Sequence, residues 1–332
     1  MRLSQSLIVF FSNTQKMSSK TFPHIRKFDV TMSDGLESIP KIYTLDEKKV
    51  ILKKLMNVYK PHSLEIGSII STKLCPQMKQ SYELYNYANK LYNDKQQTKK
   101  VNVCDFYLLV PPTKKYIELA HKLQIKNIAL NTSLNTSLNT SLNTSLNIIS
   151  NQIKNKVQYQ SLQETKDTIK EVLKIPGRFN KVKVYVPCIS NCSNKYSIKD
   201  KKHELDNEHI LNELYEYLHI DGVSEVCLTD TYGNMRYSNF KHIIDYLNIE
   251  MNYKLDKLSL HLHINHHDEK KYYTIDNIIK YAINNNVNKF DLTSFENIYF
   301  GNSIIKVDVK QFNNNLTYDR LYESIYNNFI YV

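Results

Sequence analysis

The chain has 332 residues, 42% of them hydrophobic, which is enough to bury one large core or two ordinary ones. Its formal net charge of +11 raises the question of an anionic partner, either nucleic acid or a phosphate-bearing cofactor. The charge excess is mostly Lys and comes with many Asn and Tyr, no Trp and only 6 Gly, a residue set typical of AT-rich codons. No basic cluster interleaved with aromatic residues stands out, so we do not expect nucleic acid as a partner.

The cysteines and the N-terminus indicate where the protein resides. The 5 cysteines are scattered and odd in number, which predicts a reducing compartment and no disulfide framework. No stretch is long and apolar enough to span a membrane. Residues 1–26 carry basic but no acidic residues, a weak match to a mitochondrial leader, with an untargeted extension as the alternative. We therefore expect a cytoplasmic protein, or else a mitochondrial one, in which residues 1–26 precede the folded domain.

Short β-rich runs alternate with longer amphipathic helical patterns along the rest of the chain. The runs are 27–34, 63–68, 101–110, 125–133, 181–190, 224–230, 257–264 and 288–294. Eight βα units in one series predict a single (β/α)8 barrel, the α/β TIM-barrel class, over residues 27–330. A doubly wound open sheet is the alternative, but no Gly-rich phosphate loop follows the first run.

One segment does not belong to this pattern. The stretch "NTSLNTSLNTSLNTSLN" at 131–147 repeats a four-residue unit in tandem. Its low-complexity composition gives it little reason to pack into a core. We interpret residues 131–150 as a loop insertion after the fourth strand.

The seventh run, "KLSLHLHIN", is unusual for a buried strand. In an extended strand, residues two apart point to the same side, so Ser259, His261 and His263 share one face while leucines occupy the other. One interpretation is that these are structural histidines, hydrogen-bonded within the core. Two histidines on one face at the end of a strand instead favour a functional site.

In a barrel of this kind, the active site lies at the carboxyl ends of the strands. The polar residues that the pattern places there are Asp34, Glu65, Asp230, His261 and His263. Two imidazoles and a carboxylate at one mouth have the donor set for a divalent cation with positions left open for substrate. The sequence therefore predicts a metal site at this end of the barrel.

These residues also carry a family resemblance. In chain order, the segments "DVTMSDGLES", "LEIGSIISTKLCPQM", "YVPCISNC", "VCLTDTYG", "LSLHLHI", "FDLTSFENIYFGNS" and "NNLTYD" resemble motifs of the hydroxymethylglutaryl-CoA lyases. That family belongs to the metal-dependent pyruvate-carboxyltransferase-like barrels, also called DRE-TIM metallolyases. The resemblance implies a TIM barrel, an Mg²⁺ or Mn²⁺ cofactor, an acyl-CoA substrate and a homodimer. The implied reaction is a retro-Claisen cleavage that yields acetyl-CoA and a ketoacid.

The resemblance also implies roles for individual residues. It places the metal ligands at Asp34, His261, His263 and Asn315, and further catalytic groups at Glu65 and Asp230. Asn313 and Asn314 precede Asn315, so the alignment with the family's asparagine ligand leaves open which of the three residues corresponds to it.

Two positions depart from the family pattern. Ser33 stands where the family has an arginine next to the metal-binding aspartate, and Asn302 stands where it has a proton-transferring cysteine. An amide does not titrate, so Asn302 cannot replace a thiol as general acid or base. The nearby cation that we nominate for binding the cofactor or substrate is Lys73, in the loop after the second strand.

These departures leave more than one function open. The first hypothesis is a divergent metal-dependent acyl-CoA lyase. The second is a catalytically impaired barrel that keeps its metal, which the missing arginine and cysteine favour. A condensing synthase of the same superfamily would explain the missing cysteine but not the missing arginine. A basic nucleic-acid binder is the hypothesis from a different class, and no motif supports it.

Overall fold

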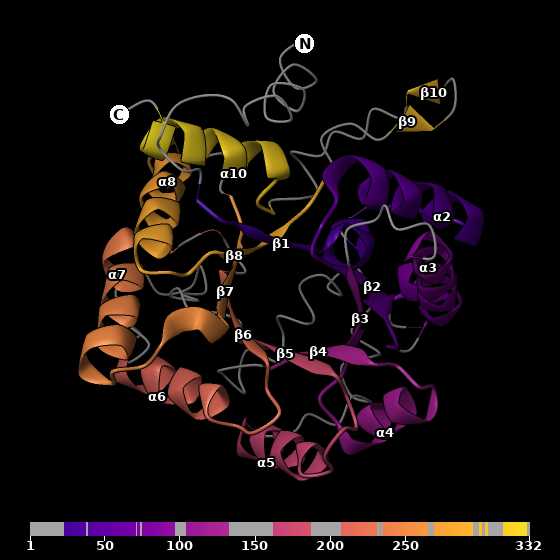
Figure 1. Cartoon of the computed structure of the whole chain (residues 1–332), viewed down its shortest axis with the longest axis horizontal. Coiled ribbons are helices and arrows are strands. Elements are labelled where there is room, and N and C mark those ends of the chain that lie inside the picture. The colour runs from indigo at the N-terminus through magenta and orange to yellow at the C-terminus, as the bar shows by residue number, and fades with distance from the viewer. Residues whose placement is uncertain are drawn as a thin grey trace.

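The computed structural model describes residues 23–37, 39–70, 72–73, 75–96, 104–132, 162–186, 207–230, 233, 235–264, 269–294, 299–300, 303–304 and 315–330. Within these residues, eight parallel strands form a closed barrel in chain order, and the last strand pairs with the first (Figure 1). The strands are β1 (Arg26–Asp29), β2 (Ser63–Ser68), β3 (Asp105–Val110), β4 (Asn127–Asn131), β5 (Lys181–Val186), β6 (Glu225–Asp230), β7 (Leu258–Leu262) and β8 (Lys289–Leu292). The predicted TIM barrel is confirmed.

Helices surround the barrel and alternate with the strands along the chain (Figure 1). They are α2 (Leu45–Lys54), α3 (Ser81–Gln96), α4 (Lys114–Lys122), α5 (Leu162–Leu173), α6 (Asn207–Leu218), α7 (Tyr237–Asp245), α8 (Glu269–Asn284) and α10 (Tyr318–Ile325). A short antiparallel pair, β9 (Tyr299–Phe300) with β10 (Ser303–Ile304), forms a separate two-stranded sheet. None of the described helices has the length and apolar character needed to cross a membrane.

The two-residue alternation of the strands decides what the barrel interior contains. All five residues of β7 are buried, with Leu258, Leu260 and Leu262 alternating with Ser259 and His261. The leucines belong to the main hydrophobic core, whereas the alternating polar residues do not. This is the arrangement expected when the apolar face packs against the helices and the other face lines the barrel.

The first strand is shorter than predicted, and its early end determines where Asp34 lies. β1 ends at Asp29, and a π-helical turn (Thr31–Gly35) follows it. The Asp29 carboxylate accepts a hydrogen bond from the Thr31 backbone N–H at 2.8 Å, a local contact that competes with continued strand pairing. Tyr318 at the start of α10 donates to the other Asp29 oxygen at 2.7 Å. Asp34 therefore lies in a turn above the strand and not within it.

The helix starts show why the outer layer forms where it does. Thr44 caps α2: its hydroxyl accepts from the Glu47 N–H while the Glu47 carboxylate accepts from the Thr44 N–H. Each partner satisfies a backbone donor that the helix leaves open. Thr317 caps α10 through one contact, in which its hydroxyl accepts a hydrogen bond from the Arg320 N–H. Residues 1–22 and 133–161, which hold most of the predicted extension and loop insertion, lie outside the described residues.

Replacing Leu260 by Ala tests the packing of β7 against the helices. Leu260 has no exposed surface, so the substitution leaves a cavity and should lower the free energy of unfolding by about 2–5 kcal/mol. The matched control is Ile249→Ala, at a side chain that is 68% exposed, where we expect a change below about 0.5 kcal/mol. Urea denaturation followed by circular dichroism measures both, and equal effects would contradict this packing.

Candidate metal centre

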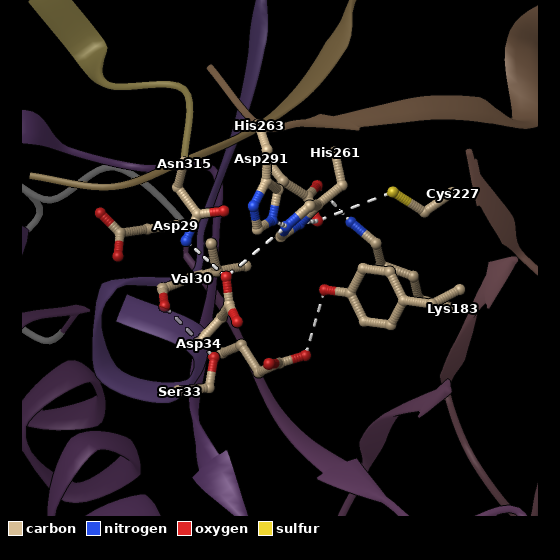
Figure 2. A network of polar contacts seen from close by, with 12 residues as sticks. Asp29, Val30, Ser33, Asp34, Lys183, Cys227, His261, His263, Asp291 and Asn315 are labelled. Carbon is tan, nitrogen blue, oxygen red and sulfur yellow. Dashed lines mark hydrogen bonds and ion pairs between the residues drawn. The ribbon is translucent and has the colours of Figure 1, made fainter. Parts of the chain in front are cut away.

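Three side chains that suit a metal ion meet at the carboxyl end of the barrel. Asp34, His261 and His263 each offer one ligand atom, and these atoms lie within 4.8 Å of one another. Asp34 comes from the turn after β1, and the two histidines come from the end of β7 (Figure 2). Asn315, on the segment that leads into α10, forms a β-bridge with His263 and so joins the cluster. The structure thus brings the four predicted ligands together, although Asn313 and Asn314 lie outside the described residues.

The donor atoms have the spacing of ligands around one ion. The two histidine Nε2 atoms are 3.0 Å apart, and His261 Nε2 is 3.6 Å from Asp34 Oδ2. Neighbouring ligands around a metal with bonds of about 2.1 Å lie about 3.0 Å apart when they subtend a right angle. Imidazole and carboxylate together suit several divalent cations. The residues present therefore fit a metal ion.

Asn315 contacts this cluster through its amide nitrogen. Its Nδ2 donates a hydrogen bond to Asp34 Oδ2 (Figure 2). In this orientation Asn315 positions the carboxylate, and ligation through Oδ1 would require the amide to turn over. The amide oxygen and nitrogen exchange places by rotation about one side-chain bond, so both roles are within reach of the same backbone.

The charges around the two histidines set their pKa values in opposite directions. Burial alone would lower the pKa of His261, but hydrogen bonds and charges from Asp291 and Asp34 outweigh it and raise the pKa to about 10. Burial and the positive charge of His261 lower the pKa of His263 to about 4. Burial would raise the pKa of Asp34, but contacts with His261, His263 and Asn315 hold it well below its usual range. The surroundings of the cluster thus favour one positive charge. Protonated His261 carries it here, and a bound cation would also supply it.

Below the histidines, a buried ion pair lies inside the barrel. Asp291 Oδ2 is 3.3 Å from His261 Nδ1, and Asp291 Oδ1 is 2.5 Å from Lys183 Nζ. The side chains of Lys183 and Asp291 have no exposed surface. Lys183 Nζ also lies 3.5 Å from the centre of the Phe28 ring, a cation–π contact. Asp291 thereby engages the ring nitrogen of His261 that faces away from the cluster, as carboxylates do behind metal-binding histidines.

Sequence reasoning missed both members of this pair. Lys183 lies in the alternating run "KVKVYV" and Asp291 in "KFDL", each a charged residue in the middle of a strand. A mid-strand charge flanked by buried apolar residues was the available signal. It was uninformative alone, because the same pattern describes a strand whose polar face meets solvent.

Glu65, predicted as catalytic, lies in β2 and is 2% exposed. Tyr185 from β5 donates to Glu65 Oε2 at 3.2 Å. Burial raises the pKa of Glu65 to about 7, and hydrogen bonds from Ser33 and Tyr185 and the charge of Lys183 limit the rise. Ser33 is also buried, and its hydroxyl donates to the Val30 carbonyl at 3.3 Å. A neutral serine therefore faces Glu65 at the position where the family resemblance implies a cation.

The remaining predicted residues lie in different surroundings. Asp230 ends β6, is 3% exposed and accepts a hydrogen bond from the Met235 N–H at 2.8 Å. Its charge also acts on His263, so it lies near the cluster. Lys73 is exposed, and none of the contacts found among the described residues joins it to the cluster. Asn302 lies outside the described residues.

One further titratable group near the cluster escaped the sequence reasoning. Burial and the charge of Asp34 raise the pKa of Glu37 to about 7, and the Cys75 thiol opposes this by hydrogen bonding to the carboxylate. Glu37 follows Asp34 by three residues, a spacing that places both on one side of a helical turn. This spacing is the sequence feature from which Glu37 could have been predicted to lie near the cluster.

The chain is similar to known proteins in its structure. No family model and no curated protein matches the sequence. Among solved structures, hydroxymethylglutaryl-CoA lyase from Pseudomonas aeruginosa aligns with a TM-score of 0.65 at 17% identity, covering 94% of this chain and 88% of that chain. HMG-CoA lyase from Brucella melitensis gives 0.64 at 15% identity, covering 92% and 91%. HMG-CoA lyase from Acinetobacter baumannii, solved with coenzyme A and 3-methylmalate, gives 0.63 at 16%, covering 92% and 84%.

The barrel has the fold of the hydroxymethylglutaryl-CoA lyases. The resemblance that the motifs predicted is confirmed as a structural similarity over more than nine tenths of the chain. At 15–17% identity, this likeness shows the fold alone, whereas the cluster of Asp34, His261 and His263 is an observation on this chain's own residues.

The Lys183–Asp291 pair gives a prediction about stability. Lys183→Met leaves the buried carboxylate of Asp291 without its main partner, so we expect a loss of about 3–5 kcal/mol in the free energy of unfolding. Combining it with Asp291→Asn removes the charge as well and should recover part of that loss. Chemical denaturation of the two single variants and the double variant measures the coupling. Additive effects would show that the two groups do not depend on each other.

Glu65 gives a prediction about pH. A carboxyl pKa raised from 4.5 to about 7 means that the folded protein binds the proton more tightly, so its contribution to stability is lost as pH rises through this range. Glu65→Gln mimics the protonated form, so its free energy of unfolding should not fall in this way. Its advantage over wild type should grow from pH 5 to pH 8 and reach up to about 3 kcal/mol. Denaturation in EDTA at both pH values measures the difference. A pH-independent difference would contradict the raised pKa.

Proposed function

We propose that this chain is a divalent-metal-dependent carbon–carbon lyase of the hydroxymethylglutaryl-CoA lyase type, acting on a 3-hydroxyacyl-CoA. The observation that carries the proposal is the Asp34, His261 and His263 cluster at the carboxyl end of a barrel with that fold. The A. baumannii lyase was solved with coenzyme A, which supports an acyl-CoA as the substrate class here.

The residues that would hold the ion are Asp34, His261 and His263, with Asn315 as a fourth ligand through Oδ1. When bound, the ion would supply a Lewis acid that polarises the substrate oxygens and stabilises developing negative charge. Asp291 holds the ring of His261 from behind, so that Nε2 faces Asp34 and His263. Asp34 is 40% exposed, which leaves the cluster accessible from the mouth of the barrel.

Retro-Claisen cleavage also needs proton transfer by protein groups. The substrate hydroxyl loses a proton as the carbon–carbon bond breaks, and the resulting enolate of acetyl-CoA gains one. Glu65 is suited to one of these transfers because its pKa of about 7 leaves both protonation states populated near neutral pH. Asp230, at the end of β6 near His263, is the second carboxylate that we assign to the reaction.

The missing positive charge bears on the rate. Ser33 offers a neutral hydroxyl, and the buried cation of Lys183 is already engaged by Asp291 at 2.5 Å and Glu225 at 3.0 Å. Loss of one donor to a developing oxyanion typically lowers a rate by about 10²–10³-fold. The same observation favours a second candidate function, a metal-binding barrel of this family without turnover.

The first test is acetoacetate release from hydroxymethylglutaryl-CoA by the purified protein with Mg²⁺ or Mn²⁺ and in EDTA. We expect slow, metal-dependent release. If protein that binds Mn²⁺ releases no acetoacetate, two hypotheses remain: a metal-binding barrel without turnover, or a substrate with another acyl chain.

His261→Ala separates metal binding from turnover. It removes a central ligand, so we expect Mn²⁺ affinity to fall at least about 100-fold and activity to be lost with it. His242→Ala, at an exposed histidine on α7, is the matched control and should change neither. Calorimetric titration with Mn²⁺ is the readout besides activity, and activity that survives the loss of metal would refute the site.

A further inference from the structure

A second concave site lies at the opposite end of the barrel from the metal cluster. It is a cavity of about 150 Å³. Its lining includes the first residues of several strands: Arg26 of β1, Ser63 of β2, Lys181 of β5, Glu225 of β6 and Lys289 of β8. Asp34 and His263, by contrast, follow the last residues of β1 and β7. The cavity is therefore separate from the proposed catalytic mouth.

The charge of this cavity is unbalanced. Four cationic side chains line it, Arg26, Lys27, Lys181 and Lys289, against one carboxylate, Glu225. Glu225 is shared, because it lies 3.0 Å from the buried Lys183 and 3.7 Å from Lys289. Because Asp291 also pairs with Lys183 at 2.5 Å, Glu225 is left to balance Lys289, and the other lining cations give this end of the barrel its positive excess.

Two of the lining cations have local partners. Lys181 pairs with Asp105 at 2.5 Å, and Lys27 donates to the Tyr59 carbonyl at 2.7 Å. Arg26 differs: among the contacts of the described residues, none places a carboxylate on its guanidinium group. Lys289 shares its partner Glu225 with Lys183. Arg26 and Lys289 are thus the lining cations whose charged groups have no hydrogen-bonded partner among the contacts of the described residues, since the 3.7 Å from Lys289 to Glu225 is longer than a hydrogen bond.

The effect of Arg26 on Lys289 agrees with this excess. Burial lowers the pKa of Lys289, and the charges of Arg26 and Lys183 lower it further, while the charges of Glu225 and Asp256 raise it. A bound anion reduces the electrostatic repulsion between cations that lie close together in a concave site. Tyr107 adds a neutral hydroxyl to the lining, and burial, followed by Glu225 and Asp105, raises the pKa of its hydroxyl, so it remains protonated and able to donate.

We propose that this cavity binds a phosphate group, either as free phosphate or as a small phosphate monoester, through Arg26 and Lys289. A guanidinium fork and an ammonium are the side chains that proteins use most for phosphate oxygens. The volume suits one phosphate group and is below the roughly 300–1,000 Å³ typical of sites for larger ligands. The site does not depend on the proposed lyase activity.

The probes are inorganic phosphate and glycerol 3-phosphate, titrated into the full chain by calorimetry in EDTA with chloride held constant. We expect saturable binding at one site. Tighter binding of the ester identifies a monoester as the ligand class, and equal or weaker binding of the ester identifies free phosphate. Absence of saturable binding of either probe would overturn the proposal.

Variants locate the binding. Arg26→Gln and Lys289→Gln should each weaken phosphate binding about tenfold, because each removes a charge-assisted hydrogen bond. Lys122→Gln, an exposed lysine on α4, has the same charge change and should leave binding unaltered. Arg26 is exposed, so its variant should fold, and circular dichroism checks this. Equal weakening in all three variants would show a diffuse charge effect and refute the site. Unchanged binding in His261→Ala separates this result from failure of the lyase proposal.

Discussion

A buried charge in the centre of the barrel constrains much of the structure. Lys183 brings an ammonium group to a place with no solvent, where an isolated charge is strongly unfavourable. Asp291 and Glu225 compensate it from two other strands, and the ring of Phe28 covers it. The register that joins β5, β6 and β8 is therefore tied to one set of ionic contacts. A shift of any of these strands by one residue would leave a charge unpaired.

This ionic core also links the two ends of the barrel. Towards the carboxyl end, Asp291 contacts His261 of the metal cluster. Towards the amino end, Glu225 contacts Lys289 beside the cationic cavity. The polar face that crosses the barrel is thus continuous, while the leucine face of β7 packs outward into the hydrophobic core. The barrel separates these two environments by the alternation of the strands alone.

The architecture and the grouping of Asp34, His261 and His263 at one end of the barrel were predictable from sequence because they rest on local patterns. Eight apolar runs separated by amphipathic stretches define the barrel, and the His-x-His spacing places two imidazoles on one face. The roles of Lys183 and Asp291 were not predictable. A charge flanked by apolar residues in a strand gives the same sequence pattern whether its face meets water or the interior of a closed barrel, and only the closure of the barrel decides between them. The contact of Asp29, the last residue of β1, with Tyr318 was not predictable either, because the two residues are 289 positions apart.

The contacts of the first strand with the last helix have a consequence for how the protein comes into being. Asp34 accepts a hydrogen bond from Asn315, and Asp29 accepts one from Tyr318, so the turn that presents the Asp34 carboxylate is completed by a segment nearly at the other end of the chain. During synthesis, β1 leaves the ribosome long before Asn315 and Tyr318 have been made, so these two contacts form last. A nascent chain can assemble most of the barrel wall before this centre exists. The candidate metal centre can therefore be complete only after the segment that contains Asn315 and Tyr318 has been made and the barrel has closed.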